Sequence, residues 1–330
     1  IPADRIVFSG VGKTAEEMAY ALQDGLFQFN LESVAEAEMM SEVASRLGVE
    51  APVAFRVNPD VEAGTHAKIS TGAAHNKFGV PIDEARAAYA RVRALPNMRI
   101  QGVAVHIGSQ LTDLAPLEAA FAKVGTLIGL LREDGHVITH ADLGGGLGVP
   151  YDRDMPEPPS PEAYGAMVAR ITAGWNVRLV FEPGRLIVAN AGVLLSEVIR
   201  VKPGVADPFV IVDAAMNDLM RPSLYDAFHA IEPVRPRGEE MVANVVGPVC
   251  ESGDTFATSR RMGAVESGDL VVFRTSGAYG ATMASTYNSR PLTPEVLVTG
   301  NDYAVVRERQ DIEALIHADR LPPWLGGRDV

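Results

Sequence analysis

The chain has 330 residues, of which 47% are hydrophobic and 22% charged, and its formal net charge is −13 at neutral pH. Its length provides one large domain or two ordinary ones, whereas the acidic balance and the short apolar stretches argue against a general nucleic-acid binder and a membrane protein. The single cysteine excludes an intrachain disulfide framework and a multi-cysteine metal site, and it is typical of a reducing compartment. We therefore expect a cytoplasmic protein that uses no metal and binds neither nucleic acid nor membrane.

The first 190 residues predict strands that alternate with helices. Short runs rich in Val, Ile, Leu and Phe are typical of strands buried on both faces, and Ala-rich segments with Ser33 and Ser160 as helix caps lie between them. Such alternation indicates βαβ units and a parallel sheet. The predicted strands are residues 5–8, 26–29, 53–57, 100–106, 140–143 and 178–181, and the predicted helices are residues 14–22, 33–47, 82–95, 114–132 and 161–173.

Polar residues or glycines stand at the carboxyl end of each predicted strand. In a closed (β/α) barrel these ends meet at one mouth, whereas an open doubly wound sheet concentrates its chemistry at one switch point. The sequence therefore favours a barrel. Because such a barrel has eight strands and six are predicted here, we also expect two strand–helix units before Ile1, that is, an N-terminally incomplete chain. The strand-end residues are Ser9, Asn30, Asn58, His106, Gly144 to Gly146 and Glu182.

After about residue 190 the pattern changes to strands separated by turns rich in Pro, Gly and Asp. This change predicts a second, mainly β domain, either a small barrel or a sandwich. We therefore expect an α/β barrel domain at residues 1–190 and a β domain at residues 191–330. The strands predicted there are residues 193–201, 209–213, 242–249, 269–273, 295–298 and 303–307, with short helices near residues 223–230 and 311–318.

Three short strings of the first domain suggest anion binding. The glycines of residues 143–148 let backbone N–H groups approach an anion, although the same string also fits a tight strand–helix turn. Arg185, which follows Glu182 closely, can clamp a carboxylate or phosphate, or else form a salt bridge with Glu182. Lys13 lies in a string similar to a P-loop, but Val7 occupies the position of the first glycine, so we expect Lys13 to be a surface or rim residue.

Seven strings along the chain carry a resemblance to a known family. They are HIGSQ at 106–110, GGGLG at 144–148, EPGR at 182–185, MNDLMRPSLY at 216–225, GPVCESGD at 247–254, GAYGATMASTYNSRP at 277–291 and EVLV at 295–298. In this order they resemble the fold-type III pyridoxal-phosphate decarboxylases, and in particular the diaminopimelate decarboxylase family of lysine biosynthesis. The resemblance runs from residue 5 to about residue 317. It implies a pyridoxal-phosphate-binding (β/α)8 barrel of the TIM type followed by a C-terminal, mainly β domain.

The resemblance also implies pyridoxal 5′-phosphate as the cofactor. His106 would stack on the cofactor ring. Glu182 would bond the pyridine nitrogen and keep it protonated, so that the ring accepts the electrons released with CO2. The other groups implied around the ring and the phosphate are Ser109, Gly144, Gly145, Gly146, Pro183, Gly184, Arg185 and Tyr279.

The reaction implied by the resemblance is decarboxylation of meso-2,6-diaminopimelate to L-lysine through an external aldimine. Glu251 would meet the distal ammonium of the substrate, and Cys250 would protonate the carbanion, with His106 as the second catalytic residue. In this family Cys250 and Glu251 reach into the site of the partner subunit, which implies a homodimer. The residues implied in substrate binding are Arg185, Arg221, Tyr225, Glu251 and Tyr279.

The sequence departs from the family at one point. The family's Schiff-base lysine lies on an early barrel strand in a Val-Lys-Ala type of motif, and none of Lys13, Lys68, Lys77, Lys123 and Lys202 has that context. We therefore expect the Schiff-base lysine upstream of Ile1 and the chain alone to be inactive. Two alternatives stay open: a related ornithine, arginine or carboxynorspermidine decarboxylase, and a non-catalytic homologue that acts by dimerisation.

Overall fold

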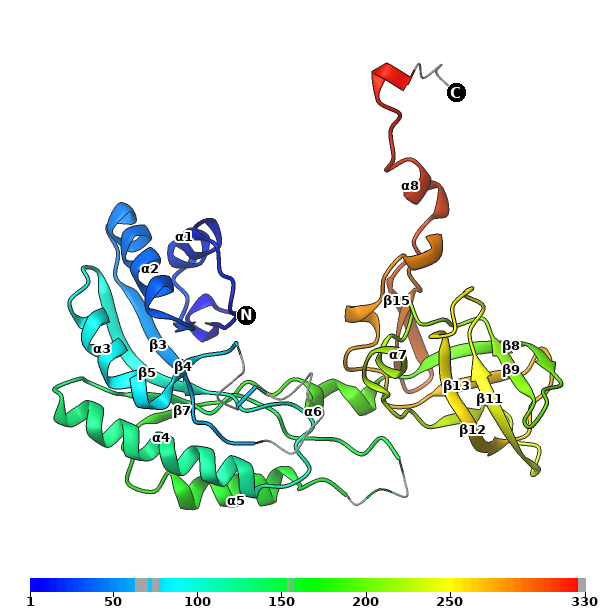
Figure 1. Ribbon diagram of the computed structural model, residues 1–330, viewed down its shortest axis with the longest axis horizontal. Helices are drawn as coiled ribbons and strands as arrows, with labels where there is room; N and C mark the ends of the chain where they lie inside the picture. The colour runs from blue at the N-terminus through cyan, green and yellow to red at the C-terminus, as the bar shows by residue number, and fades with distance from the viewer. Residues whose placement is uncertain (63–70, 73–76, 153–154, 156, 326–330) are drawn as a thin grey trace. The chain divides into compact units, whose positions relative to one another are not determined.

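The computed structural model describes residues 1–62, 71–72, 77–152, 155 and 157–325 (Figure 1). These residues form two compact units, which are described separately. The first unit consists of Ile1–Val149 and Pro156–Leu186, and the second of Pro150–Met155 and Ile187–Val330.

The first unit is built on a seven-stranded parallel sheet. The strand order β1-β2-β3-β5-β6-β7 follows the chain, and β4 pairs with β3. All six predicted strands are confirmed, and only the two-residue strand β4 was not predicted. The strands are β1 (Val7–Phe8), β2 (Gln28–Leu31), β3 (Ala51–Asn58), β4 (Val80–Pro81), β5 (Met98–Val105), β6 (His140–Asp142) and β7 (Arg178–Val180).

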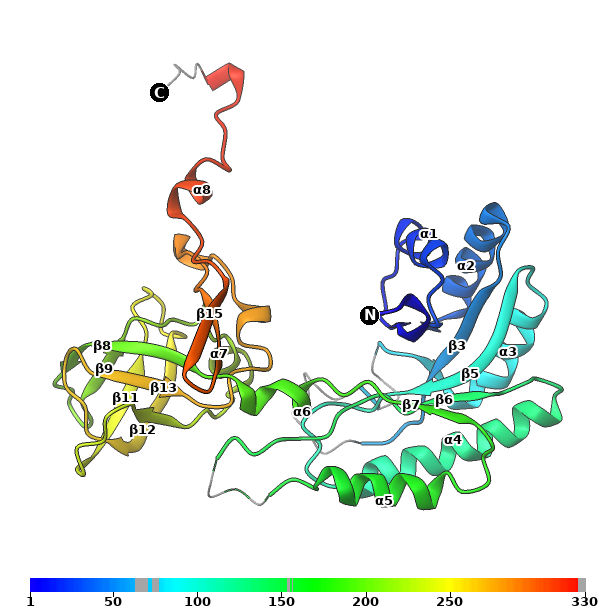
Figure 2. The same ribbon diagram turned by 180° about the vertical axis from the view of Figure 1, so that it is seen from behind.

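The helices of the first unit follow one another around the outside of the sheet (Figures 1 and 2). Each helix packs on the next one, from α1 through α5. A doubly wound sheet would reverse its strand order and carry helices on both faces, so this arrangement excludes the open-sheet alternative. The helices are α1 (Ala15–Asp24), α2 (Val34–Leu47), α3 (Ala85–Arg93), α4 (Ala115–Glu133) and α5 (Pro161–Ile171), with a 3-10 turn, Ile82–Glu84, before α3.

The sheet curls so far that its two edge strands approach each other at their carboxyl ends. In a flat sheet, five strand spacings would separate β1 from β7 by roughly 24 Å. Instead the Oγ of Ser9, just after β1, lies 3.1 Å from both carboxylate oxygens of Glu182, just after β7. This curvature is that of a barrel wall, with the strand ends gathered at one mouth.

Side-chain caps fix where these helices begin. Thr14 and Glu17 form a capping box at the start of α1. Ser33 and Ser160 accept backbone N–H groups at the starts of α2 and α5, as predicted from the sequence.

The second unit contains a six-stranded sheet in the order β10-β13-β8-β9-β11-β12 and a separate hairpin, β14-β15. Within the larger sheet, β9 and β11 are parallel and the other pairs antiparallel. Its core includes Val198, Val210, Val245 and Phe273, which are fully buried. The strands are β8 (Leu194–Lys202), β9 (Phe209–Val212), β10 (Ile231–Pro233), β11 (Glu240–Val246), β12 (Thr255–Gly263), β13 (Leu270–Phe273), β14 (Glu295–Thr299) and β15 (Asp302–Arg307).

Two features of the second unit differ from the sequence-based prediction. Strands β10 and β12 were not predicted, because β12 (TFATSRRMG) carries several polar and charged residues that weaken the apolar alternation. The helix expected near residues 223–230 is only α7 (Arg221–Tyr225), since Asp226 adopts a left-handed conformation with φ 51° that ends it. The remaining helices are α6 (Arg185–Val188), at the junction of the two units, and α8 (Ile312–Ile316).

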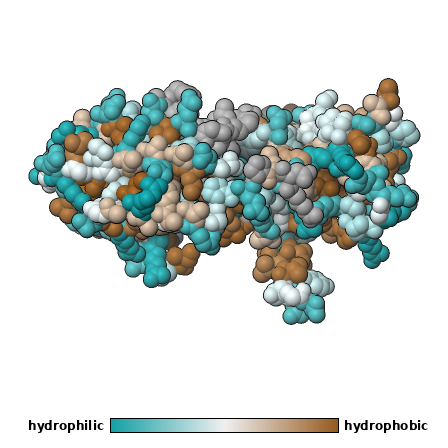
Figure 3. All heavy atoms as spheres, turned by 90° about the horizontal axis from the view of Figure 1, so that it is seen from below, coloured by the Kyte–Doolittle hydropathy of each residue, from teal (hydrophilic) through white to brown (hydrophobic). Residues whose placement is uncertain are grey.

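No helix among the described residues is long and apolar enough to cross a membrane. On the face in Figure 3, hydrophilic residues are interspersed with hydrophobic ones.

Candidate active site

A cluster of polar side chains occupies the mouth of the curled sheet. Asn30 in β2 donates from Nδ2 to Asp142 Oδ2 at 2.8 Å and to Glu182 Oε1 at 3.3 Å. Ser9 lies 3.0 Å from the same amide and donates to Glu182. Sequence reasoning marked Ser9, Asn30 and Glu182 as strand-end residues but missed Asp142, a buried carboxylate at the end of an apolar strand. The one sequence feature that could have indicated Asp142 is a single acidic residue inside an otherwise uncharged predicted strand.

The charge balance of this cluster is unusual. Burial, followed by the negative charge of Asp142, raises the pKa of Glu182 to about 8, and the Ser9 hydroxyl and the Arg56 charge oppose this only in part. The Glu182 carboxyl group therefore keeps its proton at neutral pH in the folded protein. A cationic N–H group placed against Glu182 would relieve this repulsion and restore the second negative charge.

His106 follows β5 and faces the glycine loop. Its Nδ1 accepts a hydrogen bond from the backbone N–H of Gly145 at 3.3 Å. Burial and the positive charge of Arg56 lower the pKa of His106 to about 4. The imidazole is therefore neutral at physiological pH, which suits a ring that stacks on another ring.

The glycine loop, Gly144 to Gly146, has no room for a side chain at any of its three positions. A Cβ on Gly144 would lie 2.5 Å from the carbonyl oxygen of Val105, and one on Gly145 would lie 2.2 Å from that of Glu182. Gly144 and Gly146 also have φ angles of 65° and 114°, which favour glycine. The loop thus packs as backbone against the ends of β5 and β7, beside a cavity of about 60 Å³ that Pro183 and Gly184 also line.

Arg185 and Ser109 connect two of the sequence strings. Arg185, the first residue of α6, is buried, and its Nε and Nη2 donate to the Ser109 hydroxyl at 3.3 and 3.1 Å. The structure therefore joins the EPGR and HIGSQ strings through a guanidinium at the mouth. This is the position from which an anion can be bound.

The expectation that Lys13 lies at the surface is wrong. Its ammonium group is buried and lies 2.7 Å from Glu36 Oε1, from the carbonyl oxygen of Gly10 and from that of Asn30. Three acceptors offset the cost of removing the charge from water. Lys13 therefore ties the loop that carries Ser9 to β2 and α2, a role that no local pattern in the sequence indicated.

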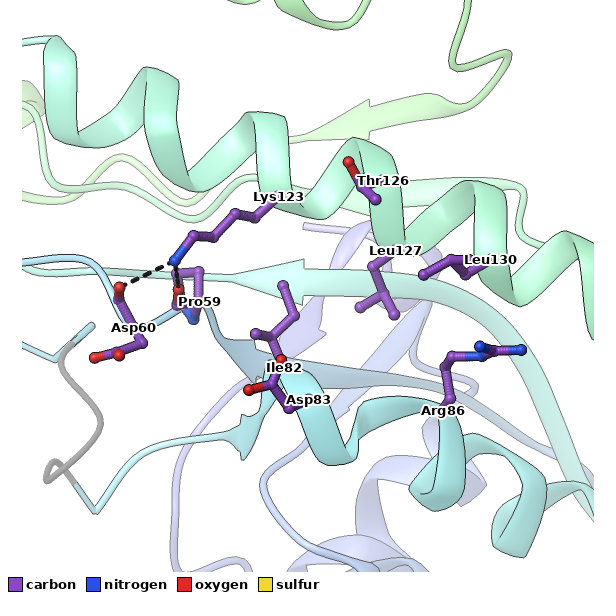
Figure 4. A pocket seen from close by; sticks show the side chains of 9 residues that line it. All are labelled: Pro59, Asp60, Ile82, Asp83, Arg86, Lys123, Thr126, Leu127 and Leu130. Atoms are coloured by element: carbon purple, nitrogen blue, oxygen red, sulfur yellow. Dashed lines mark hydrogen bonds between the residues drawn. The ribbon is translucent and has the colours of Figure 1, made fainter.

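The other lysines lie in different surroundings. Lys123 of α4 donates to the carbonyl oxygens of Pro59 and Asp60, at the edge of a cavity of about 450 Å³ between α3 and α4 (Figure 4). Lys77 lies over the ring of Phe78, and Lys202 is exposed at the end of β8. Lys68 lies outside the described residues.

The second unit holds a separate group of predicted site residues. Arg221 of α7 is buried, with its Nη1 2.7 Å from His229 Nε2 and its guanidinium 4.4 Å from the centre of the Tyr151 ring. Tyr225 ends the same helix and is half-buried, and Tyr279 is exposed with a φ angle of 60°. Sequence reasoning missed His229, because a histidine eight residues from Arg221 carries no local signal of contact.

Cys250 and Glu251 lie on an exposed loop that is anchored by hydrogen bonds to the Asp254 carboxylate. Both residues are exposed. The buried Asp254 carboxylate accepts the backbone N–H groups of Met216 and Val249, each at 2.7 Å. This explains the GPVCESGD string: its last residue anchors the loop that presents the thiol and the carboxylate.

Comparisons with known proteins agree with this architecture. A family model described as the pyridoxal-binding domain of pyridoxal-dependent decarboxylases matches residues 1–189. Diaminopimelate decarboxylase of Zymomonas mobilis is 58% identical over 325 residues, which cover 98% of this chain and 77% of the relative. The predicted fold class, a barrel of this type followed by a mainly β domain, is confirmed by the solved structures below.

Two solved diaminopimelate decarboxylases are similar over nearly the whole chain. The enzyme from Helicobacter pylori complexed with L-lysine has a TM-score of 0.92 at 40% identity, covering 96% of this chain and 79% of that one. The enzyme from M. jannaschii in co-complex with L-lysine has a TM-score of 0.93 at 37% identity, covering 98% and 76%. With the strand order, the mouth cluster and these matches, we conclude that the chain belongs to the diaminopimelate decarboxylase family of pyridoxal-dependent decarboxylases.

Proposed function

We propose that this chain takes part in the decarboxylation of meso-2,6-diaminopimelate to L-lysine and CO2, with pyridoxal 5′-phosphate as cofactor. The observation that carries the proposal is the carboxyl pair of Glu182 and Asp142 at the barrel mouth, beside a glycine loop without room for a Cβ. Membership of the family supports it, as do the two relatives solved with L-lysine, the product of this reaction.

The residues at the mouth fit this cofactor. A protonated pyridine nitrogen is the kind of cationic N–H group that the raised pKa of Glu182 calls for. An anionic phosphate suits the backbone of Gly144, Gly145 and Gly146 and the buried guanidinium of Arg185. When bound, the cofactor accepts the electron pair left behind by the departing CO2.

In this proposal each residue of the first unit has a distinct task. Glu182 keeps the proton on the ring nitrogen, and Ser9 and Asn30 hold both of its oxygens in place. His106, neutral at physiological pH, would stack on the ring without taking up a proton. The residues proposed to bind the phosphate and the part of the cofactor next to it are Ser109, Gly144, Gly145, Gly146, Pro183, Gly184 and Arg185, together with Tyr279 of the second unit.

The second unit supplies most of the groups for the substrate. Its Arg221, Tyr225 and Tyr279, together with Arg185 of the first unit, bind the substrate carboxylates, since guanidinium and phenol groups donate hydrogen bonds to carboxylates. Glu251 accepts a hydrogen bond from the distal ammonium. Cys250 donates the thiol proton to the carbon that has lost CO2.

We further propose a homodimer in which Cys250 and Glu251 enter the site of the partner subunit. The exposure of both residues on a loop whose backbone is hydrogen-bonded to Asp254 supports this proposal. Mixing two inactive variants of the protein expressed from its complete coding sequence, Cys250→Ala and Glu182→Gln, tests it. Mixed dimers should regain activity, because one of their two sites then combines an intact thiol with an intact ring-binding carboxylate. No regain after subunit exchange would contradict the shared site.

Covalent attachment of the cofactor does not, in this proposal, involve the lysines of this chain, so that the chain alone is inactive. The ammonium of Lys13 is committed to Glu36 and two carbonyl groups, and that of Lys123 to two carbonyl groups. Borohydride reduction in the presence of pyridoxal phosphate, followed by peptide mapping, should leave these lysines unlabelled. A stoichiometric label on Lys13 would overturn the assignment.

The function itself is tested by CO2 release from meso-diaminopimelate by the protein expressed from its complete coding sequence. Release above the buffer rate is expected, with little from ornithine or arginine. Arg221→Ala should lower kcat/KM for diaminopimelate about 100-fold, because the distal carboxylate loses a buried cation. The exposed Arg200→Ala on β8 is the matched control. Absence of CO2 release from the unaltered protein would refute the proposal.

A further inference from the structure

Tyr287 contacts the carboxylate that the proposed function assigns to the distal ammonium. Its hydroxyl oxygen lies 2.5 Å from Glu251 Oε2, across 36 residues of sequence. Because an ionised carboxylate only accepts hydrogen bonds, the phenol is the donor. The hydrogen bond and the charge of Glu251 raise the pKa of Tyr287, so the phenol keeps its proton. Tyr287 belongs to the GAYGATMASTYNSRP string, of which the proposed function uses only Tyr279.

The segment that carries Tyr287 is anchored to the loop after β9. Arg290 donates from Nε to Asn217 Oδ1 at 2.9 Å and from Nη2 to the carbonyl oxygen of Asp213 at 2.5 Å. Asn217 in turn donates from Nδ2 to the carbonyl oxygen of Ser285 and accepts, at its own carbonyl, the N–H of Ser285. The segment is therefore held on both sides of Tyr287.

The loop that carries Glu251 is anchored to the same place. Asp254 accepts the N–H of Met216, which lies between Asp213 and Asn217. One short stretch of backbone, residues 213–218, thus supports both the carboxylate loop and the tyrosine segment. The distance between Tyr287 and Glu251 is set by this common support rather than by the two exposed side chains alone.

The backbone next to Tyr287 is held in an uncommon conformation. Asn288 and Ser289 have φ angles of 58° and 56°, two consecutive left-handed residues that are not glycine. Such residues persist where the surrounding contacts determine them. Here the Arg290 contacts hold the backbone on one side of this turn, and the phenol on its other side contacts Glu251.

We propose that Tyr287 is a positioning residue that orients Glu251 towards the distal ammonium of the substrate. An exposed glutamate samples many rotamers, and ordering it on binding costs conformational entropy. With Oε2 held by the phenol, Oε1 is left to accept from the ammonium in a defined direction. This inference rests on the proposed function and names a further determinant of its specificity.

Tyr287→Phe removes only the hydroxyl and tests the inference directly. In the protein expressed from its complete coding sequence, we expect KM for meso-diaminopimelate to rise about tenfold, since a hydrogen bond to a charged group is lost, while kcat changes little. Tyr20→Phe, at an exposed position of α1, is the matched control and should leave both constants unchanged.

Two competitive inhibitors separate orientation of Glu251 from a general defect. L-lysine retains the distal ammonium and carboxylate, so its inhibition constant should rise about as much as KM in Tyr287→Phe. 2-Aminopimelate lacks the distal ammonium and should inhibit both proteins equally. Unchanged KM and lysine inhibition, or a weakening of both inhibitors alike, would overturn the inference. Activity of the unaltered protein decides the proposed function separately, since the inference concerns only the ratio between variant and unaltered protein.

Discussion

Nη1 of Arg221 lies 2.7 Å from Nε2 of His229, and Nδ1 of the same imidazole lies 2.8 Å from the carbonyl oxygen of Arg274. Because a carbonyl oxygen only accepts, Nδ1 carries the proton and Nε2 is left as the acceptor for the guanidinium. Both side chains are buried, and the Tyr151 ring contacts each of them. The direction in which Arg221 presents its remaining N–H groups is therefore set by a neutral histidine.

Replacing His229 should impair substrate binding by Arg221 to a degree that depends on whether the new side chain can still accept a hydrogen bond. His229→Leu removes a hydrogen-bond acceptor from a buried guanidinium, so we expect a loss of about 1–3 kcal/mol in the free energy of unfolding and a higher KM for diaminopimelate. His229→Gln retains an acceptor for Arg221 and should recover much of the KM. Urea unfolding and steady-state kinetics measure the two effects. Equal KM values for the two variants would speak against control of Arg221 by His229.

Glu182 should make the stability of the cofactor-free protein depend on pH. Its pKa is raised in the folded state, to about 8 from an ordinary value of 4.5, so its contribution is fully present below pH 4.5 and is lost as the pH rises towards 8. Glu182→Gln lacks this loss. The variant should therefore gain stability relative to the original protein between pH 5 and pH 8, as measured by denaturant unfolding at several pH values.

The control for this experiment is Glu16→Gln, at an exposed position of α1, which should show no such trend. Addition of pyridoxal phosphate should reverse the effect, because a cationic ring nitrogen favours ionised Glu182. A pH-independent difference between Glu182→Gln and the original protein would contradict the raised pKa.

A methyl group on the glycine loop should weaken cofactor binding. In Gly145→Ala the new Cβ would meet the carbonyl oxygen of Glu182 at 2.2 Å, so the loop must shift away from its place beside His106. We expect at least a tenfold weaker affinity for pyridoxal phosphate, followed by its absorbance. Gly165→Ala, in α5 with open space around the new Cβ, is the control and should stabilise the helix slightly. Unchanged cofactor affinity in Gly145→Ala would argue against the phosphate cradle.

Removing only one partner of the buried ion pair between Lys13 and Glu36 should lower the stability of the protein strongly. Lys13→Met leaves Glu36 charged and buried with its main cation removed, which we expect to cost about 3–5 kcal/mol in the free energy of unfolding. The double variant Lys13→Met/Glu36→Gln should recover part of that loss, and a double-mutant cycle gives the coupling energy. A single variant within about 0.5 kcal/mol of the original protein would show that the ammonium is not needed there.

Strands and helices of the barrel unit were predictable because their signals are local. Buried parallel strands are short apolar runs. Ser33 and Ser160 are N-cap residues, which indicate where α2 and α5 begin. The prediction failed for β12, whose apolar positions are interrupted by Ser, Thr and Arg, since antiparallel strands at a sheet edge tolerate polar residues. It also overextended α7, which a left-handed Asp226 ends early.

By itself, the sequence determined the fold class and the family, because strand periodicity and seven ordered strings are properties of neighbouring residues. Only the tertiary structure decided which polar groups meet. Ser9 bonds Glu182 across 173 residues, Lys13 is buried rather than exposed, and Tyr287 reaches Glu251. The physical reason is that a local pattern indicates which face of an element is apolar. The partner of a polar side chain depends on how curvature and packing bring distant elements together.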